Sequence, residues 1–122
     1  MSDVARFDAS EYLPLTPAMF QVLVALADGE KHGYAVIKEV SRRTDGKVRL
    51  HTGTLYTVIK RFVVDGLVAE SAERPDPALD DERRRYYRLT DRGRAVAVAE
   101  AERLTETVRQ ARAKLTPSFR KG

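Results

Sequence analysis

The sequence contains no cysteine, and this absence excludes disulfides, thiol nucleophiles, iron–sulfur clusters and cysteine-type zinc sites together. Long apolar runs are also missing, because no stretch approaches the ~18 consecutive apolar residues of a membrane span. The start of the chain carries Asp3, Arg6, Asp8 and Glu11 where a signal peptide would need an apolar stretch. We therefore expect a cytoplasmic protein that is stabilised by packing or by oligomerisation.

Signals for catalysis are absent as well. The two histidines, His32 and His51, lie far apart with no metal-ligand spacing around them, and we interpret both as turn residues beside helix starts. No G-x-S-x-G and no phosphate-binding glycine loop occurs, and Gly29 and Gly33 are interpreted as turn glycines. The sequence predicts neither an enzyme nor a metal site, and no cofactor.

The remaining composition is that of an ordinary globular chain. Its 122 residues, 43% hydrophobic and 33% charged, fit one domain with one core. The net charge is +4 and the pI is near 9.6. Residues 1–31 hold two basic and five acidic side chains, so the basic excess begins only at His32. A mild excess of this kind indicates a nucleic-acid partner only where it is concentrated on one surface.

Helix starts and stops divide the first half of the chain into three helices. Thr16 before Pro17 is a helix start, because threonine caps free N–H groups and proline suits the first helical position, and this helix should end near Asp28-Gly29. A second helix is predicted over 33–44, and a third from a Thr52 cap to Asp65-Gly66. Apolar side chains recur at helical spacing in each: Met19, Phe20, Val22, Leu23 and Leu26 in the first, Tyr34, Ile37 and Val40 in the second, and Leu55, Val58, Ile59 and Phe62 in the third.

The second half changes period. Residues 67–72 and 85–89 are typical of two short strands, and the proline-containing acidic segment 74–82 between them is predicted to be an exposed hairpin tip. Thr90 then caps a long helix that ends before Pro117, with Asp91 in its first turn. This helix carries a heptad-like seam of Val96 or Ala97, Ala101, Leu104, Val108, Ala111 and Leu115.

Three short helices followed by a hairpin predict a mainly α fold with a small β-hairpin, a winged helix-turn-helix, plus a long C-terminal dimerisation helix. A helix of roughly 39 Å cannot bury such a seam against a core this small, so we expect a second copy of the chain to cover it. The predicted organisation is an N-terminal extension (1–15), the winged helix-turn-helix domain (16–89), the dimerisation helix (90–116) and a tail (117–122).

The third helix is the candidate recognition helix. The side of this helix opposite its core stripe has small and hydroxylated residues near the N-terminus and the cations Lys60 and Arg61 near the C-terminus. This order suits contact with base edges and phosphates, although a solvated amphipathic helix would look similar. In the wing, Arg83, Arg84 and Arg85 can meet the DNA backbone or pair with the acids before them. Tyr34 and Tyr56 can fill the core with a hydroxyl on phosphate. The predicted DNA-binding residues are Tyr34, Lys38, Thr52, Gly53, Thr54, Tyr56, Thr57, Lys60, Arg61, Arg83, Arg84 and Arg85.

Four short motifs occur in order between residues 16 and 95. They are His32-Gly33-Tyr34, Gly53-Thr54-Leu55-Tyr56, Asp65-Gly66-Leu67-Val68, and Arg85-Tyr86-Tyr87-Arg88-Leu89-Thr90 followed by Gly93-Arg94. Together they resemble the PadR family of bacterial transcriptional regulators, in its short subgroup with a single helix after the wing. The resemblance implies a homodimer, usually a repressor, that binds an operator with two-fold character and in many members releases it on binding a small aromatic or hydrophobic effector.

By position, Tyr34 and Tyr56 match family tyrosines near the DNA backbone, and Thr54, Thr57 and Lys60 match groove-facing positions. The chain departs from the family at His51-Thr52, where Ser or Pro is common, and at Val63-Val64, where acidic residues are common. It also has no tryptophan, whereas multidrug-responsive members stack planar ligands on a tryptophan of the last helix.

An effector site is predicted between the final helices, because alanines there leave space where large side chains are missing. The alternative is a closed seam, because alanines also let the helices approach until no cavity remains. Its residues would be Met19, Phe20, Val96 and Ala97. The alternative to a DNA-binding repressor is a winged-helix module that uses the third helix and hairpin to bind another protein. A steep fall of affinity with salt would distinguish the first from the second.

Overall fold

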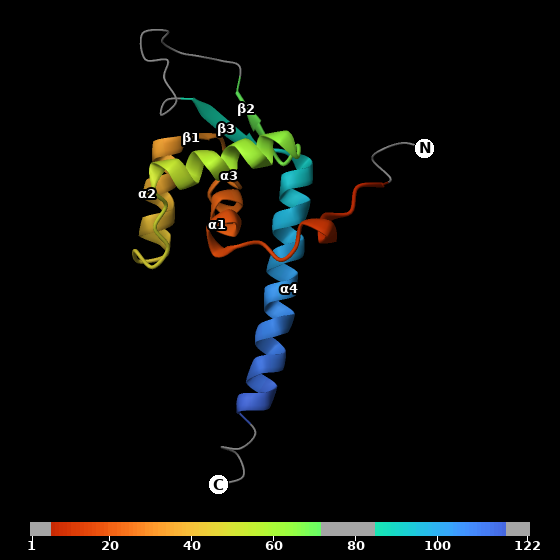
Figure 1. Ribbon diagram of the computed structural model, residues 1–122. Coiled ribbons are helices and arrows are strands. Elements are labelled where there is room, and N and C mark those ends of the chain that lie inside the picture. Colours follow the sequence, from red (N-terminus) through yellow and green to blue (C-terminus); the bar gives the residue numbers. More distant parts are fainter. Residues whose placement is uncertain (1–5, 72–84, 117–122) are drawn as a thin grey trace.

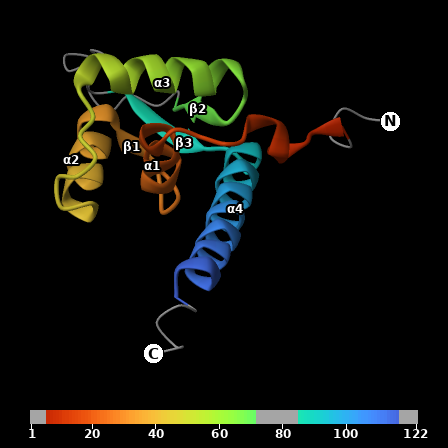
Figure 2. The same ribbon diagram turned by 60° about the horizontal axis from the view of Figure 1, so that its bottom comes forward.

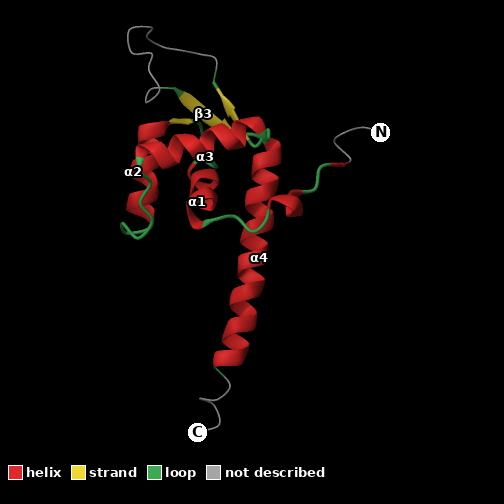
Figure 3. Cartoon of the chain, viewed as in Figure 1, coloured by secondary structure: helices red, strands yellow, loops and turns green. Residues whose placement is uncertain are grey.

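The computed structural model describes residues 6–71 and 85–116. A 3-10 turn, η2 (Ala9–Tyr12), precedes the helices α1 (Pro17–Ala25), α2 (Gly33–Arg43) and α3 (Thr52–Val64). The strands β2 (Val68–Glu70) and β3 (Tyr86–Leu89) follow, and then the long helix α4 (Asp91–Leu115). This order, drawn by element type in Figure 3, confirms the predicted mainly α fold with a small sheet and a long last helix. The predicted hairpin tip and tail lie outside the described residues.

The sheet has one strand more than the sequence predicts. A short strand, β1 (Lys31–His32), pairs antiparallel with β3, so that Lys31 lies opposite Tyr87 and the order is β1-β3-β2. The two predicted strands do pair antiparallel as β2 and β3, which confirms that part of the prediction, and β1 is an additional strand that the sequence did not predict. A strand of two residues is too short to show the alternation by which strands are recognised, and its burial pattern carries no period.

Side-chain caps start most of the helices at the predicted places. The Thr16 hydroxyl accepts from the Met19 N–H at 3.1 Å, and the Thr90 hydroxyl accepts from the Gly93 N–H at 3.0 Å. His32, interpreted as a turn residue, caps α2 through Nδ1, which accepts from the Ala35 N–H at 3.1 Å. The expectation for α3 is wrong by one residue, because its N-cap is His51, without a side-chain bond, and Thr52 is already helical.

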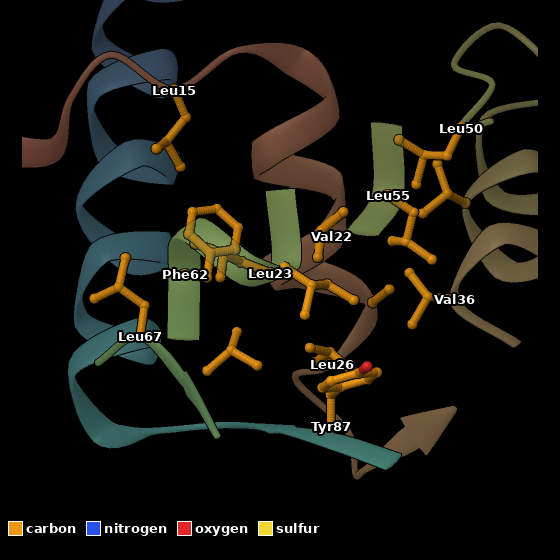
Figure 4. Packing of buried hydrophobic residues seen from close by; sticks show 14 of the residues in the cluster. Leu15, Val22, Leu23, Leu26, Val36, Leu50, Leu55, Phe62, Leu67 and Tyr87 are labelled. Atoms are coloured by element: carbon orange, nitrogen blue, oxygen red, sulfur yellow. The ribbon is translucent and has the colours of Figure 1, made fainter. Parts of the chain in front are cut away.

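The core lies where α1, α2 and α3 meet the sheet and the start of α4. Figure 4 shows Leu23, Leu26 and Phe62 packed together at its centre. Leu55, Ile59 and Phe62 of the predicted α3 stripe are buried, while Val58 is half-buried at the edge. This packing fixes which side of α3 faces outward.

The buried face of α2 differs from the predicted one. Val36 and Val40 are buried together with Gly33, whereas Tyr34 is exposed and Ile37 is half-buried. Gly33 is the first residue of α2 and not a turn glycine. A Cβ at this position would lie 2.9 Å from Cζ of Tyr56, so the glycine makes room for that ring.

The long helix α4 has two different halves. Its first half packs on the core through Gly93 and Val96, and a Cβ on Gly93 would lie only 3.0 Å from the carbonyl carbon of Leu67. Beyond Arg103 every residue up to Leu115 is exposed, and Figures 1 and 2 show this half projecting from the body. Among the described residues, no helix combines the length and apolar character needed to cross a membrane.

The N-terminal extension docks on α4, a contact that no pattern in the sequence predicted. The turn η2 contacts α4, the Arg92 guanidinium lies 4.9 Å from the Phe7 ring centroid, and Leu15 is buried in the core. Glu100 of α4, only 1% exposed, accepts from the Leu15 N–H at 3.0 Å and from the Arg103 Nε at 2.6 Å. These hydrogen bonds lower the pKa of Glu100, that from Arg103 contributing most. The buried charge is thereby fully paired.

Candidate nucleic-acid interface

The outward side of α3 is a continuous row of small, polar and charged residues that ends in the apolar Val64. At 100° per residue, Gly53, Thr57, Lys60 and Val64 lie opposite the buried stripe, and all four are exposed. Thr54 and Arg61 are also exposed and flank this row on one side. In Figure 1, α3 runs along the surface of the body. We call these six residues the α3 outer face.

The first turn of α3 is open to close approach. Thr52 and Gly53 are exposed, and a Cβ built on Gly53 would have no atom within 4 Å. Because His51 provides no side-chain bond, the N–H groups of this turn have no side-chain cap. A free helix start of this kind favours a phosphate oxygen.

The two predicted tyrosines lie at the junction of α2 and α3 but in different environments. Tyr34 is exposed, and the Lys38 ammonium lies 5.2 Å from the centroid of its ring. Tyr56 is half-buried against Gly33, so its ring belongs to the packing between the two helices. The interpretation of Tyr34 as core filler is therefore wrong, while Tyr56 does pack at the edge of the core.

Of the three arginines predicted to contact DNA from the wing, Arg85 is the one that the structure describes. Arg85, beside β3, donates from Nη1 to the Glu70 carboxylate at 3.2 Å. Arg83 and Arg84 lie outside the described residues, so their predicted contact with the DNA backbone stays a prediction.

A groove separates α3 from the wing, with a volume of about 650 Å³. Sequence reasoning missed several of its residues: Val63 and Val64 are exposed at the end of α3, and Glu70 and Tyr87 come from the strands. The departure from the family at Val63-Val64 could have drawn attention to the first two. The full lining is Gly53, Tyr56, Thr57, Ile59, Lys60, Arg61, Val63, Val64, Glu70, Arg85 and Tyr87.

The cations of the groove are not equivalent. Arg61 donates to Asp65 at 3.2 Å and Arg85 to Glu70 at the same distance, whereas Lys60 makes no ion pair with any described residue. No group of three or more histidine, aspartate or glutamate side chains within 6–71 and 85–116 is arranged to hold a metal ion. The chemistry available here is the binding of anions and of hydrogen-bonding edges.

The predicted dimer seam divides at the end of the core. Val96 is fully buried in the single chain and so belongs to the core, whereas Ala97 is half-buried and the rest of the seam is exposed. Of the predicted effector residues, Met19 and Phe20 are half-buried against the core, as is Ala97. The exposed part of the seam consists of Ala101, Leu104, Val108, Ala111 and Leu115.

Comparison with known proteins identifies relatives of this chain. The model of the Transcriptional regulator PadR-like family matches residues 22–99. A curated relative, Transcriptional regulator Rv3488 of Mycobacterium tuberculosis, is 34% identical over 89 residues, which cover 73% of this chain and 77% of the relative. The matched region contains α2, α3, the strands and the start of α4.

Solved structures share the fold. A transcriptional regulator from Clostridium thermocellum, Cth-833, superimposes with a TM-score of 0.65 at 24% identity, covering 94% of this chain and 99% of that chain. The PadR-like transcriptional regulator BC4206 from Bacillus cereus gives a TM-score of 0.64 at 17% identity, covering 81% of this chain and 91% of that chain. At these identities the likeness concerns the fold alone, and it agrees with the winged helix-turn-helix predicted from the sequence.

Proposed function

This chain belongs to the PadR-like family of transcriptional regulators, and from that premise we propose that it binds a pseudo-palindromic DNA operator as a homodimer and represses transcription there. The observation that carries the proposal is the α3 outer face, a solvent-exposed row of threonines and cations opposite the buried stripe. A family of transcriptional regulators gives no reason to expect catalysis, and we propose no enzymatic activity.

The dimensions and chemistry of α3 suit the major groove. The groove of B-DNA is about 12 Å wide and admits an α-helix. Thr54 and Thr57 carry hydroxyl and methyl groups that can contact base edges or a thymine methyl. Lys60 and Arg61 supply charge for phosphates, and the open first turn at Thr52 and Gly53 offers N–H groups to another phosphate.

Tyr34 and Lys38 extend the proposed contact to the start of α2. The exposed Tyr34 hydroxyl can donate to a phosphate oxygen, and the Lys38 ammonium beside its ring adds positive charge at the same place. Tyr56 supports this arrangement by packing against Gly33. In the wing, we propose that Arg85 contacts the DNA backbone, and we extend the proposal to Arg83 and Arg84.

The exposed half of α4 supports the homodimer. Its apolar side chains form one stripe, from Leu104 to Leu115, that no other part of residues 6–71 and 85–116 covers. A two-fold contact through this stripe would give each operator half-site one recognition helix, with half-sites spaced by about 34–36 Å or a multiple of it.

The proposal includes an effector. An apolar or aromatic small molecule would occupy the space that the small residues leave between the final helices of the dimer, next to Ala97 and the half-buried Met19 and Phe20. Val96, the fourth predicted effector residue, is fully buried in the core and would lie behind these residues without touching the ligand. Linkage demands that operator DNA weaken ligand binding by the factor by which the ligand weakens DNA binding. Calorimetry with and without operator tests this, and equal ligand affinity in both experiments refutes release by that compound.

Footprinting on the DNA upstream of the gene that encodes this chain tests the main proposal. We expect protection of two half-sites related by two-fold symmetry, and an affinity that falls steeply as salt rises. The exposed Val63 and Val64 favour one alternative, a winged-helix module that binds another protein. A missing footprint, together with DNA affinity that is weak and insensitive to sequence, would contradict the repressor and favour this alternative.

A further inference from the structure

The salt bridge between Glu70 and Arg85 lies on the groove side of the wing, where the proposed function needs free cations. We propose that Glu70 competes with DNA phosphate for Arg85. It holds Arg85 in an ion pair that a duplex must break, and so lowers the affinity for every DNA sequence without changing which sequence is preferred. This inference rests on the proposed DNA-binding function and assigns a role to a residue outside the predicted site.

Strand geometry directs both side chains of the pair toward α3. Alternate residues of a strand share a face, so Glu70 lies on the face of Val68, and Arg85 on the face of Tyr87. Val68 and Tyr87 are buried against the core, and Glu70 pairs in register with Tyr87 across the two strands. The two charged side chains therefore extend from the inner face of the sheet toward the groove beside α3. Both belong to the lining of that groove.

The exposure of the pair makes it exchangeable. The Arg85 side chain is 45% exposed and that of Glu70 is 39% exposed. An ion pair in such a setting is weak, because water screens the attraction and both long side chains lose freedom. A phosphate can therefore replace the carboxylate on Arg85, but Glu70 then stays close to that phosphate as an unpaired negative charge. This penalty applies to any duplex, because all sequences carry the same phosphates.

The pair is not needed to hold the strands together. Main-chain pairing already joins β2 to β3 in a register that sets Val68 opposite Leu89 and Ala69 opposite Arg88. The Ser71 N–H extends this ladder by donating to the Tyr86 carbonyl at 2.8 Å. A change at Glu70 that keeps the side-chain size should therefore leave the fold intact.

The test compares Glu70→Gln with Glu102→Gln in the full-length protein. Both variants remove one negative charge, but Glu102 lies exposed on α4, outside the groove. The probes are the promoter fragment upstream of the gene and a scrambled 30-base-pair duplex, each titrated over a series of salt concentrations. We expect Glu70→Gln to bind both probes about three- to twenty-fold more tightly when both wings of a dimer engage, with little change for Glu102→Gln. The slope of log affinity against log salt should steepen by about one to two.

The effect must also depend on Arg85. In an Arg85→Ala background, Glu70→Gln should change the affinity far less than it does in the native chain. Weaker binding by Glu70→Gln would overturn the inference, since the carboxylate would then orient Arg85 for DNA. Equal gains for Glu70→Gln and Glu102→Gln would overturn it too, because net charge alone would explain them. If the native protein binds neither probe, the proposed function itself fails, which is a different result from native binding that Glu70→Gln leaves unchanged.

Discussion

Val108 is the side chain at which the proposed dimer contact can be tested with least disturbance of the single chain. It lies on the half of α4 that projects from the body and makes no contribution to the core. Replacing it by aspartate should therefore leave the protomer folded while placing a charge at the two-fold contact. We expect Val108→Asp to be a folded monomer.

The size of the effect follows from the exposure of the seam. Leu104 is 36%, Val108 46% and Leu115 69% exposed in the single chain. Burying a whole apolar side chain contributes about 1.5–3 kcal/mol, so covering the exposed part of Val108 contributes about 1 kcal/mol for each protomer. A carboxylate loses this contribution and adds a desolvation cost of several kcal/mol for each ion. With about 1 kcal/mol of lost burial and about 3 kcal/mol of desolvation for each protomer, the dimer should lose about 8 kcal/mol in total, which raises its Kd by roughly 10⁶-fold.

Sedimentation velocity at micromolar concentration measures this change directly, and circular dichroism checks that the helices persist. Ala113→Asp is the matched control, because Ala113 is exposed on the same half of α4 but faces away from the seam. We expect the control to remain a dimer and to bind DNA as the native protein does. A dimer that survives Val108→Asp as well as it survives Ala113→Asp would remove this seam from the interface.

Three further predictions concern readout and stability. Lys60→Ala should weaken binding to all duplexes alike and flatten the slope of log affinity against log salt by about one for each protomer, whereas Thr57→Ala should shift the preference among operator variants by roughly 1–3 kcal/mol. Titration of matched and altered sites measures both effects. The reverse pattern would mean that α3 is rotated about its axis relative to the proposed contact. Gly93→Ala should lower the free energy of unfolding by about 1–3 kcal/mol in urea titrations, because its methyl would overlap the backbone entering β2, while Gly53→Ala, with open space around it, should not lower it. The lowered pKa of Glu100 means that its ionised form contributes stability above the ordinary value of 4.5 and that this contribution falls as the pH drops below that value; Glu100→Gln should show a smaller loss of stability between pH 6 and pH 3, and an unchanged loss would contradict the assignment.

Local signals in the sequence predicted the helices well. The caps Thr16 and Thr90 and the stripe of Leu55, Ile59 and Phe62 depend on neighbours within one or two turns, so they can be interpreted without knowing the fold. The same periodicity predicted that Thr54, Thr57, Lys60 and Arg61 lie on the exposed side of α3, but it did not include Val64. The two-residue strand β1 and the exact N-cap of α3 were missed, because each depends on only a few residues.

Contacts between distant parts of the chain could not be predicted from these patterns. Leu15 and Glu100 are 85 positions apart. No pattern among the neighbours of Glu100 in the sequence indicates that an N-terminal segment will bury this glutamate. The pairing of Glu70 with Arg85 likewise depends on the register of β2 against β3. In the candidate site, the sequence therefore predicted the exposed residues of α3 but not the ion pair between Glu70 and Arg85 in the wing.

The division of α4 into a packed and a projecting half restricts how an effector can act on DNA binding. Gly93 packs against the backbone at Leu67, Val96 is part of the core, and Glu100 is bonded to Leu15, so the first half of α4 is tied to the body that carries α3. Within one protomer, the direction of the projecting half is therefore set relative to α3. In the proposed dimer, the distance between the two recognition helices can change only where one chain meets the other. A ligand that releases the operator must then favour a different packing of the exposed seam, and not a bend inside the body of the protomer.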